Sequence, residues 1–264
     1  MLEHFNSLSK FVLIVEYDGR HYFGFQWQSG QPTIQEKLEE AINHATGETR
    51  RVLAASRTDA GVHARYQVVS FRSGSRLSPQ ILIKALNFYL PHDIAVKNAG
   101  IVENDFDVRS DAISREYEYR ILNDLTRSPL LNDYAYHVPW KLDLDAMNEA
   151  SKFLAGEHDF TSFSASSCRT RSNIRNVFAA EFKRNGSIIC FYIKANSFLT
   201  HQVRNTVGFM INLGSGRSSI DELKRILEEK KRGLGGPAVP AHGLYLTRVN
   251  YPRHLELKYE NLFN

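Results

Sequence analysis

The sequence predicts an α+β protein made of two ferredoxin-like halves. Short apolar strand patterns alternate with amphipathic helix patterns, and the order strand-helix-strand-strand-helix-strand occurs twice. An Asn-Gly pair in the second half is typical of a hairpin between two of its strands. The length of 264 residues also suits about two domains. We expect two split βαββαβ halves, related by a pseudo-two-fold axis, with side-by-side sheets around a central cleft.

Turn residues and helix caps define the elements of the first half, which we expect to cover residues 1–108. An apolar run that ends at Asp18-Gly19 indicates a buried strand. Thr33 and Glu36 fit a capping box that precedes apolar residues at helical spacing. The predicted elements are a strand over 11–17, a helix between Thr33 and Gly47, strands over 51–56 and 67–71, a helix from Ser78-Pro79 to Pro91, and a strand over 94–102.

The second half, expected over residues 109–264, repeats this order with one additional helix. Its first strand alternates apolar and polar residues, and Ser219 with Glu222 forms a further capping box. A hinge is expected over 103–114 and a Gly/Pro-rich loop over 232–240. The predicted elements are strands over 115–122, 173–183, 188–195 and 242–251, and helices over 143–154, 199–213 and 219–229.

Composition excludes several classes of protein. Apolar residues make up 42% and charged residues 23% of the chain, which is ordinary for a globular protein. The longest early apolar run, over 11–15, is far shorter than the roughly 18 residues that a membrane span needs. Cys168 and Cys190 are too few for a disulfide framework or a cysteine-rich metal site. We therefore expect a cytoplasmic protein without membrane contact.

Charge is distributed unevenly between the two parts of the chain. Residues 1–159 carry 17 basic and 22 acidic side chains, whereas residues 160–264 carry 16 basic and 7 acidic side chains. Between 169 and 204, Glu181 is the single acidic residue among seven basic ones. A basic surface of this size suits a polyanion such as nucleic acid, and the alternative is a scatter of solvated side chains on unrelated faces.

The repeat itself indicates where function lies. The second and third strands of the second half meet at a four-residue turn, 184–187, whereas the matching connection in the first half runs from Arg57 to about residue 66. A lengthened polar loop is a place to expect a functional site. If the strand continues through Asp59, Arg57 and Asp59 share one face, and the guanidinium would orient an ionised carboxylate that can act as nucleophile or general base. The alternative is a loop-capping aspartate with a surface ion pair.

A second polar group lies on the predicted helix over 199–213. His201, Arg204, Asn205 and Gly208 form one stripe at helical spacing, and Gly208 would allow the close approach of a backbone. We interpret His201 and Asn205 as candidate substrate contacts, with a solvated helix face as the alternative for the stripe. For His63, in the loop, and for His201 taken by itself, a packed or capping role is the better interpretation. The ten histidines show no zinc-binding spacing, and the glycines of the 233–237 loop do not follow the order of a phosphate-binding loop.

The loop sequence Arg57-Thr58-Asp59-Ala60-Gly61-Val62-His63-Ala64 resembles the catalytic-aspartate motif of the tRNA pseudouridine synthase A family. Further blocks resemble this family in its own order, from about residue 11 to residue 252. They are Tyr17-Asp18-Gly19, Gly24-Phe25-Gln26, Thr33-Ile34-Gln35, Ala85-Leu86-Asn87, Leu90-Pro91, Asp93-Ile94, Arg115, Tyr117, Tyr119, the 156–160 block, Ala195-Asn196, Phe198-Leu199, Val203-Arg204, Gly243-Leu244 and Leu246.

The resemblance implies an enzyme that converts uridines at tRNA positions 38, 39 and 40, in the anticodon stem-loop, to pseudouridine. It implies a homodimer that uses no metal or organic cofactor. By resemblance, Asp59 is the catalytic aspartate and Arg57 displaces the target base. Tyr117 stacks on the target uracil, Arg204 pairs with the catalytic carboxylate, and Leu244 forms an apolar wall. A base stacked in RNA has to be flipped out before such chemistry, which suits an aromatic face and a cationic side chain.

Two residues depart from the family pattern, and three chemical paths stay open. Ser56 stands where the family usually has Gly, and Gln202 stands where it usually has Met. Asp59 could attack C1′, add at C6 or abstract the 2′ proton. The rival hypotheses are a non-catalytic RNA-binding protein with ferredoxin-like sheets, and an aspartate-dependent hydrolase of a nucleoside bond.

Overall fold

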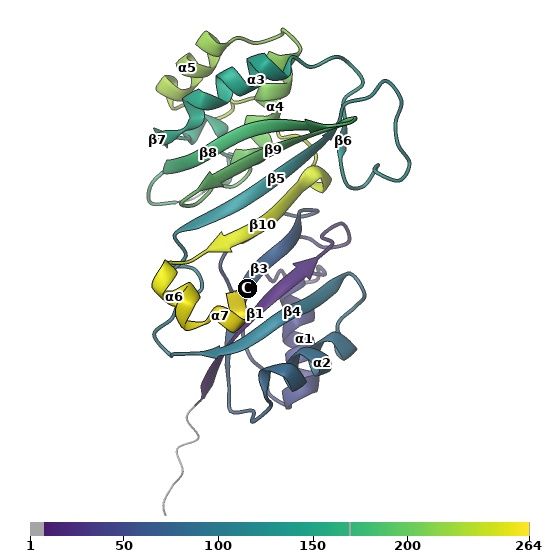
Figure 1. Ribbon diagram of the computed structural model, residues 1–264, viewed down its shortest axis with the longest axis vertical. Helices are drawn as coiled ribbons and strands as arrows, with labels where there is room; N and C mark the ends of the chain where they lie inside the picture. The colour runs from purple at the N-terminus through teal and green to yellow at the C-terminus, as the bar shows by residue number, and fades with distance from the viewer. Residues whose placement is uncertain (1–7, 169, 264) are drawn as a thin grey trace, which may run out of the picture. The chain divides into compact units, whose positions relative to one another are not determined.

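The computed structural model describes residues 8–168 and 170–263, which fall into two compact units (Figure 1). Unit 1 consists of Met1–Ile113 together with Thr247–Asn264, and unit 2 is Ser114–Leu246. Helices and strands are mixed in both units, so the predicted two-half α+β fold is confirmed. The end of the chain thus belongs to the first unit, and the first boundary lies at the end of the 103–114 segment.

The sheet of unit 1 has the strand order β4-β1-β3-β2, which is that of a split βαββαβ unit. Pairing along β3 is antiparallel, with Val12 of β1 opposite Ser70 and Leu53 of β2 opposite the same residue. The elements are β1 (Ser9–Tyr17), α1 (Ile34–Thr46), β2 (Leu53–Ala54), β3 (His63–Ser73), α2 (Pro79–Tyr89), β4 (Ile94–Val102), α6 (Arg253–Lys258) and α7 (Glu260–Phe263).

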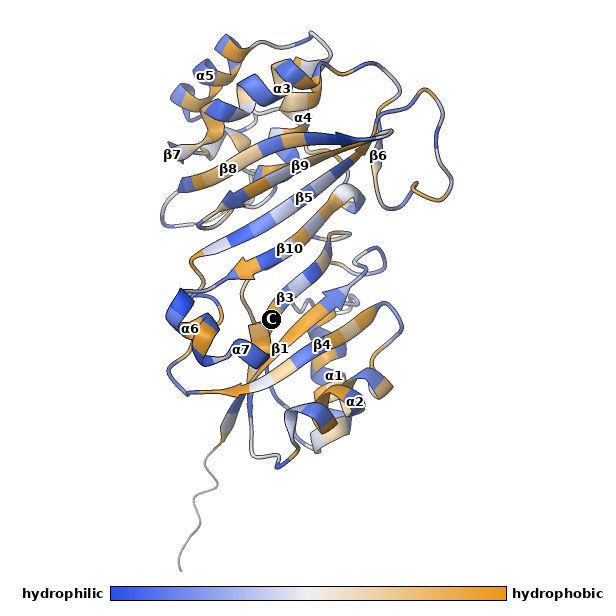
Figure 2. Cartoon of the chain, viewed as in Figure 1, coloured by the Kyte–Doolittle hydropathy of each residue, from blue (hydrophilic) through white to orange (hydrophobic). Residues whose placement is uncertain are grey.

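The central strand of unit 1 is buried on both faces. Residues 11–15 of β1 are at most 3% exposed, without the alternation of a half-solvated strand, and Figure 2 shows β1 as largely hydrophobic. Helix α2 packs on β4, and α7 packs on β1 and β4, where Leu262 contacts Gly100. The short helices α6 and α7 were not predicted from the sequence.

The predicted capping residues of unit 1 are confirmed. Thr33 Oγ1 accepts the Glu36 backbone N–H at 3.3 Å at the start of α1. Gly47 ends the helix with a φ of 73°, and its N–H donates to Asn43 O at 2.8 Å. The predicted strand over 94–102 has the bounds of β4.

The sheet of unit 2 contains the order β5-β9-β8-β7, and β6 pairs in parallel with β5. The predicted hairpin is confirmed: Asn185 pairs with Ile188, and Gly186, with a φ of 59°, and Ser187 form the turn. The elements are β5 (Ser114–Leu122), β6 (Tyr136–His137), α3 (Leu144–Ser151), β7 (Gly156–Asp159), β8 (Ile174–Asn185), β9 (Ile188–Ala195), α4 (Gln202–Gly214), α5 (Ile220–Glu229) and β10 (Leu244–Asn250).

Short 3₁₀ turns connect several of these elements. They cover Lys152–Leu154 after α3, Thr161–Phe163 after β7 and Ala241–Gly243 before β10. Strand β10 begins in unit 2 and ends in unit 1. Across residues 8–168 and 170–263, none of the helices combines the length and the apolar character that crossing a membrane requires.

Candidate active site

Strand β2 precedes the candidate loop, and its pairing with β3 ends at Ser56. There the side chain of Gln67, and not the backbone of β3, forms hydrogen bonds with the Ser56 backbone. The Ala55 N–H donates to Val68 O at 2.9 Å and continues the pairing just beyond β2. At the next residue, the fully buried amide of Gln67 donates to Ser56 O at 2.6 Å and accepts the Ser56 N–H at 3.3 Å. These bonds end the pairing at Ser56, and the predicted strand over 51–56 is observed as the two residues Leu53–Ala54.

Thr58 anchors the loop between the two candidate residues. Its side chain is buried, its hydroxyl oxygen lies 2.7 Å from Tyr17 Oη, and its carbonyl accepts the Phe25 N–H at 3.0 Å. Arg57 on one side is exposed, and Asp59 on the other side is half-buried. The strand does not continue through Asp59, so the condition for a shared strand face is not met. The anchored threonine, not a strand, determines the path of both residues.

Asp59 begins a tight turn that leads into β3. Its carbonyl accepts the Val62 N–H at 3.2 Å, and Gly61, with a φ of 76°, donates its N–H to Tyr22 O at 3.3 Å. A Cβ on Gly19 would lie 2.0 Å from Val62 O, so only glycine fits at that position. Segments far apart in the sequence thus hold the backbone around Asp59.

His63 has the packed role that the sequence analysis predicts. Its side chain is 2% exposed, and its Nδ1 lies 3.1 Å from Asp18 Oδ1 and 3.3 Å from the Gly19 nitrogen. Asp18 in turn pairs with Arg20 at 2.7 Å. The block Tyr17-Asp18-Gly19 therefore supports the loop.

Tyr117 and Leu244 lie in unit 2. Tyr117, on β5, is 6% exposed, and its ring meets the edge of Phe198 with the two centroids 5.1 Å apart. Leu244 is 5% exposed at the start of β10. Nearby on β5, Tyr119 donates its hydroxyl to Pro240 O at 2.7 Å. The ring of Tyr117 is thus held on an apolar, aromatic surface.

Helix α4 begins three residues later than predicted. The Leu199 N–H donates to Gln202 Oε1 at 2.9 Å, and His201 adopts a φ of 63° before the first turn. Gln202 therefore has a local structural function in place of the apolar contact that Met would make. Asn205 is 7% exposed and donates its Nδ2 to Phe163 O at 2.8 Å. The roles of His201 and Asn205 as substrate contacts stay predictions.

The rest of the polar stripe on α4 faces the loop that precedes β10. Arg204 donates its Nε to Val239 O at 2.8 Å. A Cβ on Gly208 would lie 2.5 Å from Pro237 O, so the predicted close approach of a backbone to this glycine is confirmed. The stripe is therefore a packed face and not a solvated one.

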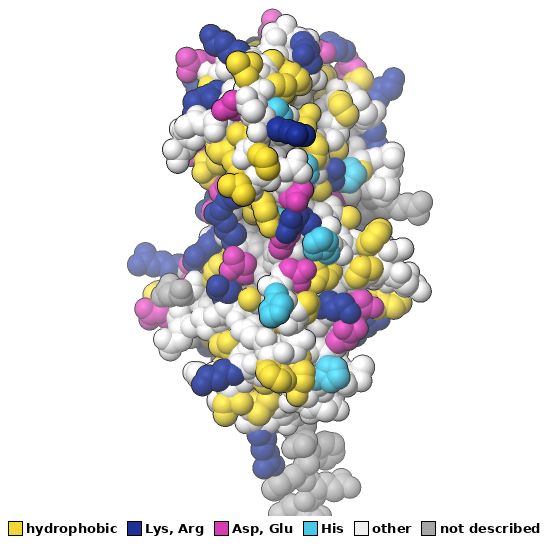
Figure 3. All heavy atoms as spheres, turned by 90° about the vertical axis from the view of Figure 1, so that its right-hand side faces the viewer, with side chains coloured by type: hydrophobic (Ala, Val, Ile, Leu, Met, Phe, Trp, Pro, Cys, Tyr) yellow, Lys and Arg dark blue, Asp and Glu magenta, His cyan; other side chains and the backbone are white. Residues whose placement is uncertain are grey.

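Several of the basic residues over 169–204 are paired or buried in unit 2. Lys183 pairs with Glu181, Lys194 pairs with Glu116, and Arg169 lies outside the described residues. Arg175 is 9% exposed and bonded to backbone carbonyls, and burial lowers the pKa of its guanidinium. On the face in Figure 3, basic, acidic and hydrophobic side chains are interspersed. On this face, the described basic side chains therefore do not gather into one patch, and the predicted basic RNA-facing surface stays a prediction.

His242 lies directly before β10, and burial lowers its pKa from the usual value near 6.5, with the charge of Arg204 acting in the same direction. The unfolded chain therefore binds this proton more readily, and the free energy of unfolding should fall as pH decreases below about 6.5. We expect His242→Gln to flatten this dependence in urea unfolding at pH 5.5 and 7.5. His254→Gln, at an exposed histidine, is the control, and an equal slope in His242→Gln and the wild type would contradict the assignment.

The structure brings Arg57 and Asp59 together in one loop of unit 1, and it places the other candidate residues, Tyr117, His201, Arg204, Asn205 and Leu244, in unit 2. Sequence reasoning missed the function of Gln67 in holding the loop. Its signal was a polar amide directly before the apolar residues Val68 and Val69 of a predicted strand. What the arrangement offers chemically is a half-buried carboxylate on a backbone held from several sides, with a guanidinium two residues away.

Comparison with known proteins adds an independent line of evidence. The profile of the family described as tRNA pseudouridine synthase matches residues 13–111 and 150–252. Proteins named tRNA pseudouridine synthase A are similar over nearly the whole chain. The one from Francisella tularensis subsp. novicida (strain U112) is 40% identical over 248 residues, which are 93% of this chain and 95% of the relative.

Two relatives from other bacteria are equally similar and carry the same name. The protein from Thermoanaerobacter sp. (strain X514) is 40% identical over 240 residues, covering 91% of this chain and 98% of its own length. The protein from Methylacidiphilum infernorum (isolate V4) is 40% identical over 243 residues, covering 92% and 95%. The segments matched by the family profile include the 57–64 loop, α4 and β10.

Proposed function

The chain belongs to the tRNA pseudouridine synthase A family, and from this premise we propose that it isomerises uridines 38, 39 and 40 of the tRNA anticodon stem-loop with Asp59 as catalytic residue. That it is a tRNA pseudouridine synthase, an isomerase acting on tRNA, follows from the family itself. The proposal adds the position in the tRNA and the residues that act.

One observation carries the assignment of Asp59. The backbone from Thr58 to Val62 is held by buried partners on both sides, among them Tyr17 and Phe25, while the Asp59 side chain stays half-buried and not enclosed. A loop-capping aspartate would need no such support from distant segments. A catalytic carboxylate does, because small displacements of a reacting group lower the rate strongly.

The isomerisation rearranges one uridine within the RNA, so it needs no second substrate that donates or accepts a chemical group. The N1–C1′ bond of the target uridine breaks, the base turns, and C5 joins C1′. The proton lost from C5 balances the proton gained at N1. We propose that Arg57 displaces the base from its stack, that Tyr117 stacks on it, and that Arg204 pairs with the carboxylate of Asp59. Leu244 forms the apolar wall of the site.

We further propose an oligomeric state, a mode of RNA recognition and a cellular compartment for the enzyme. The enzyme acts as a homodimer on the anticodon stem-loop, reading shape and 2′-hydroxyl groups more than sequence, which suits three neighbouring target positions. The reaction takes place in the cytoplasm. Both cysteines, Cys168 and Cys190, are free thiols, which suits a reducing compartment.

Tritium release from transcripts labelled with [5-³H]uridine tests the position of the target. We expect the wild-type chain to release tritium from a tRNA that carries uridine at 38, 39 or 40. A transcript with cytidine at all three positions should release none above background. Release that is unaffected by this replacement would refute the assignment to the anticodon stem-loop. Free uracil in place of pseudouridine would identify a hydrolase instead.

A further inference from the structure

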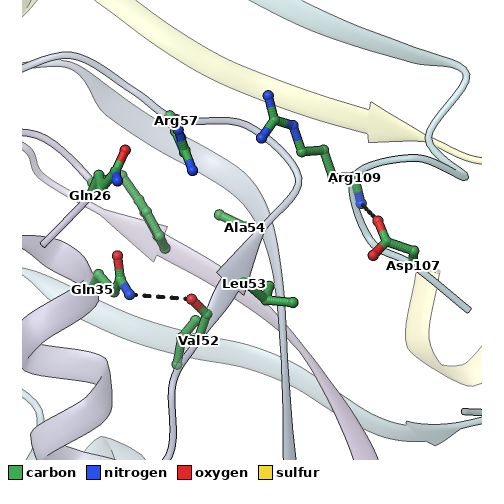
Figure 4. Close-up of a pocket in the computed structure, with 9 residues that line it drawn as sticks. Gln26, Gln35, Val52, Leu53, Ala54, Arg57, Asp107 and Arg109 are labelled. Atoms are coloured by element: carbon green, nitrogen blue, oxygen red, sulfur yellow. Dashed lines mark hydrogen bonds between the residues drawn. The ribbon is translucent and has the colours of Figure 1, made fainter.

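A pocket of about 220 Å³ opens on unit 1 beside the 57–63 loop (Figure 4). Arg57 lines it, but Asp59 is not among the described residues at its wall. Tyr117 is likewise absent from the residues that the structure describes there. Whatever enters this pocket therefore meets the arginine of the candidate loop without meeting its carboxylate.

One wall of the pocket is apolar. It consists of Phe25, Val52, Leu53 and Ala54. Phe25 is 2% exposed, whereas Leu53 keeps 57% of its surface exposed. A leucine left open beside a buried aromatic ring offers a hydrophobic surface to a planar ligand.

The opposite side of the pocket carries two arginines and one aspartate. Arg57 and Arg109 are both exposed and come from different segments, and in Figure 4 the guanidinium group of Arg109 extends toward the side of the pocket that carries Arg57. Asp107, which also lines the pocket, accepts the backbone N–H groups of Arg109 at 2.9 Å and Ser110 at 2.8 Å. Its carboxylate thereby fixes the backbone that carries Arg109. Two guanidinium groups at one rim suit a phosphate, which they can bind in a bidentate manner.

A hydrogen-bond network keeps the walls of the pocket in place. Gln35 accepts the Trp27 N–H at 3.0 Å and donates its Nε2 to Glu39 at 2.7 Å and to Val52 O at 3.3 Å. Glu39 also accepts the Val52 N–H at 3.0 Å. Helix α1 thus joins the segment that carries Phe25 to the segment that carries Leu53. A pocket formed before the ligand arrives loses little entropy on binding.

We propose that this pocket binds a ribonucleotide of the RNA substrate other than the uridine that is isomerised. Its phosphate lies at the rim that carries Arg57 and Arg109, and its base lies against the exposed side chain of Leu53. The inference rests on the proposed function, since RNA is the ligand. Because Arg57 and Asp59 are two residues apart in one held loop, the captured nucleotide is a near neighbour of the target. Its capture sets the register of the RNA at the carboxylate.

The phosphate contact is tested by Arg109→Gln, with Arg76→Gln as the matched control at another exposed arginine of unit 1. Both changes are made in full-length Asp59→Asn protein, so that turnover does not disturb binding to an unmodified anticodon stem-loop RNA. We expect Arg109→Gln to raise Kd about tenfold and to lower the slope of log Kd against log salt by about one. Arg76→Gln should change Kd less than about twofold. An equal effect of the two substitutions would overturn the proposal.

The base contact is tested by a double-mutant cycle between protein and RNA. Single abasic nucleotides are placed in turn along the anticodon loop and the adjoining stem. At one position other than the target, loss of the base should raise Kd about tenfold for Asp59→Asn protein, but less than about threefold when Leu53→Ala is added. Ile81→Ala, at an isoleucine 54% exposed against 57% for Leu53, is the control and should retain the tenfold effect.

The outcomes separate this inference from the proposed function. If no position shows coupling to Leu53 while wild-type protein releases tritium, the pocket does not bind a neighbouring base and the inference is wrong, although the proposed function stands. If coupling is found and tritium release is absent, the pocket is supported and the proposed chemistry fails.

Discussion

Replacing Asp59 by Asn should lower kcat for pseudouridine formation by at least about 10³-fold while changing Kd for tRNA by less than about threefold. The amide is close to the carboxylate in size, so the Thr58 anchor and the turn to Val62 are retained. It cannot act as a nucleophile or accept a proton in the same way. Single-turnover kinetics with labelled transcript and filter binding with the same transcript give the two quantities.

Asp105→Asn provides the control for this substitution. Asp105 is an exposed aspartate of unit 1, outside the loop, and its replacement should leave both kcat and Kd within about twofold of the wild type. If Asp59→Asn abolished binding as completely as activity, Asp59 would be structural. Equal product from Asp59→Asn and wild type would support the non-catalytic reading of this aspartate.

Gly24→Ala should displace the candidate loop and lower kcat on the order of 10²-fold. A Cβ on Gly24 would lie 2.8 Å from Thr58 O, 3.1 Å from the Ala60 nitrogen and 3.2 Å from the Asp59 carbonyl carbon. All three neighbours are backbone atoms, so the loop has to move. Because Gly24 has a φ of 90°, alanine also adds conformational strain of about 1 kcal/mol.

Gly30→Ala is the control that separates the effect of backbone strain from the effect of displacing the candidate loop. Gly30 has a φ of 71°, but a Cβ there would meet nothing within 4 Å. We therefore expect this variant to lose about 1 kcal/mol of unfolding free energy in urea and to keep kcat within about threefold of the wild type. If Gly30→Ala reduced kcat as much as Gly24→Ala, backbone strain and not the position of Asp59 would explain both results.

Much of the fold is predictable because local rules and tertiary packing agree. Thr33, with its capping bond to Glu36, and Gly47, in the left-handed region, mark the ends of α1 as local chemistry requires. Strand β2 is one exception. The side chain of Gln67, eleven residues away along the chain, binds the backbone of Ser56, and no local signal in 51–56 indicates that its ladder stops.

The sequence predicts where the candidate site lies in the chain, but it does not predict which residues hold the loop in place. The long connection after β2 and the resemblance both direct attention to Arg57 and Asp59. The partners that hold this loop, Tyr17, Phe25 and Gln67, come from other segments, so sequence spacing cannot pair them with it. The expectation of one basic surface depended on the number of charged residues in a segment, which does not say where their side chains lie on the surface.

Mapping of pseudouridine in tRNA tests the central claim, that Asp59 of this chain isomerises uridine in the anticodon stem-loop, most directly. The tRNA is taken from cells that lack the protein and are complemented with either the wild type or Asp59→Asn, and it is sequenced after a pseudouridine-specific label. The account predicts pseudouridine at 38, 39 and 40 with the wild type and uridine at the same positions with Asp59→Asn. Pseudouridine at these positions with both proteins, or with neither, would contradict it.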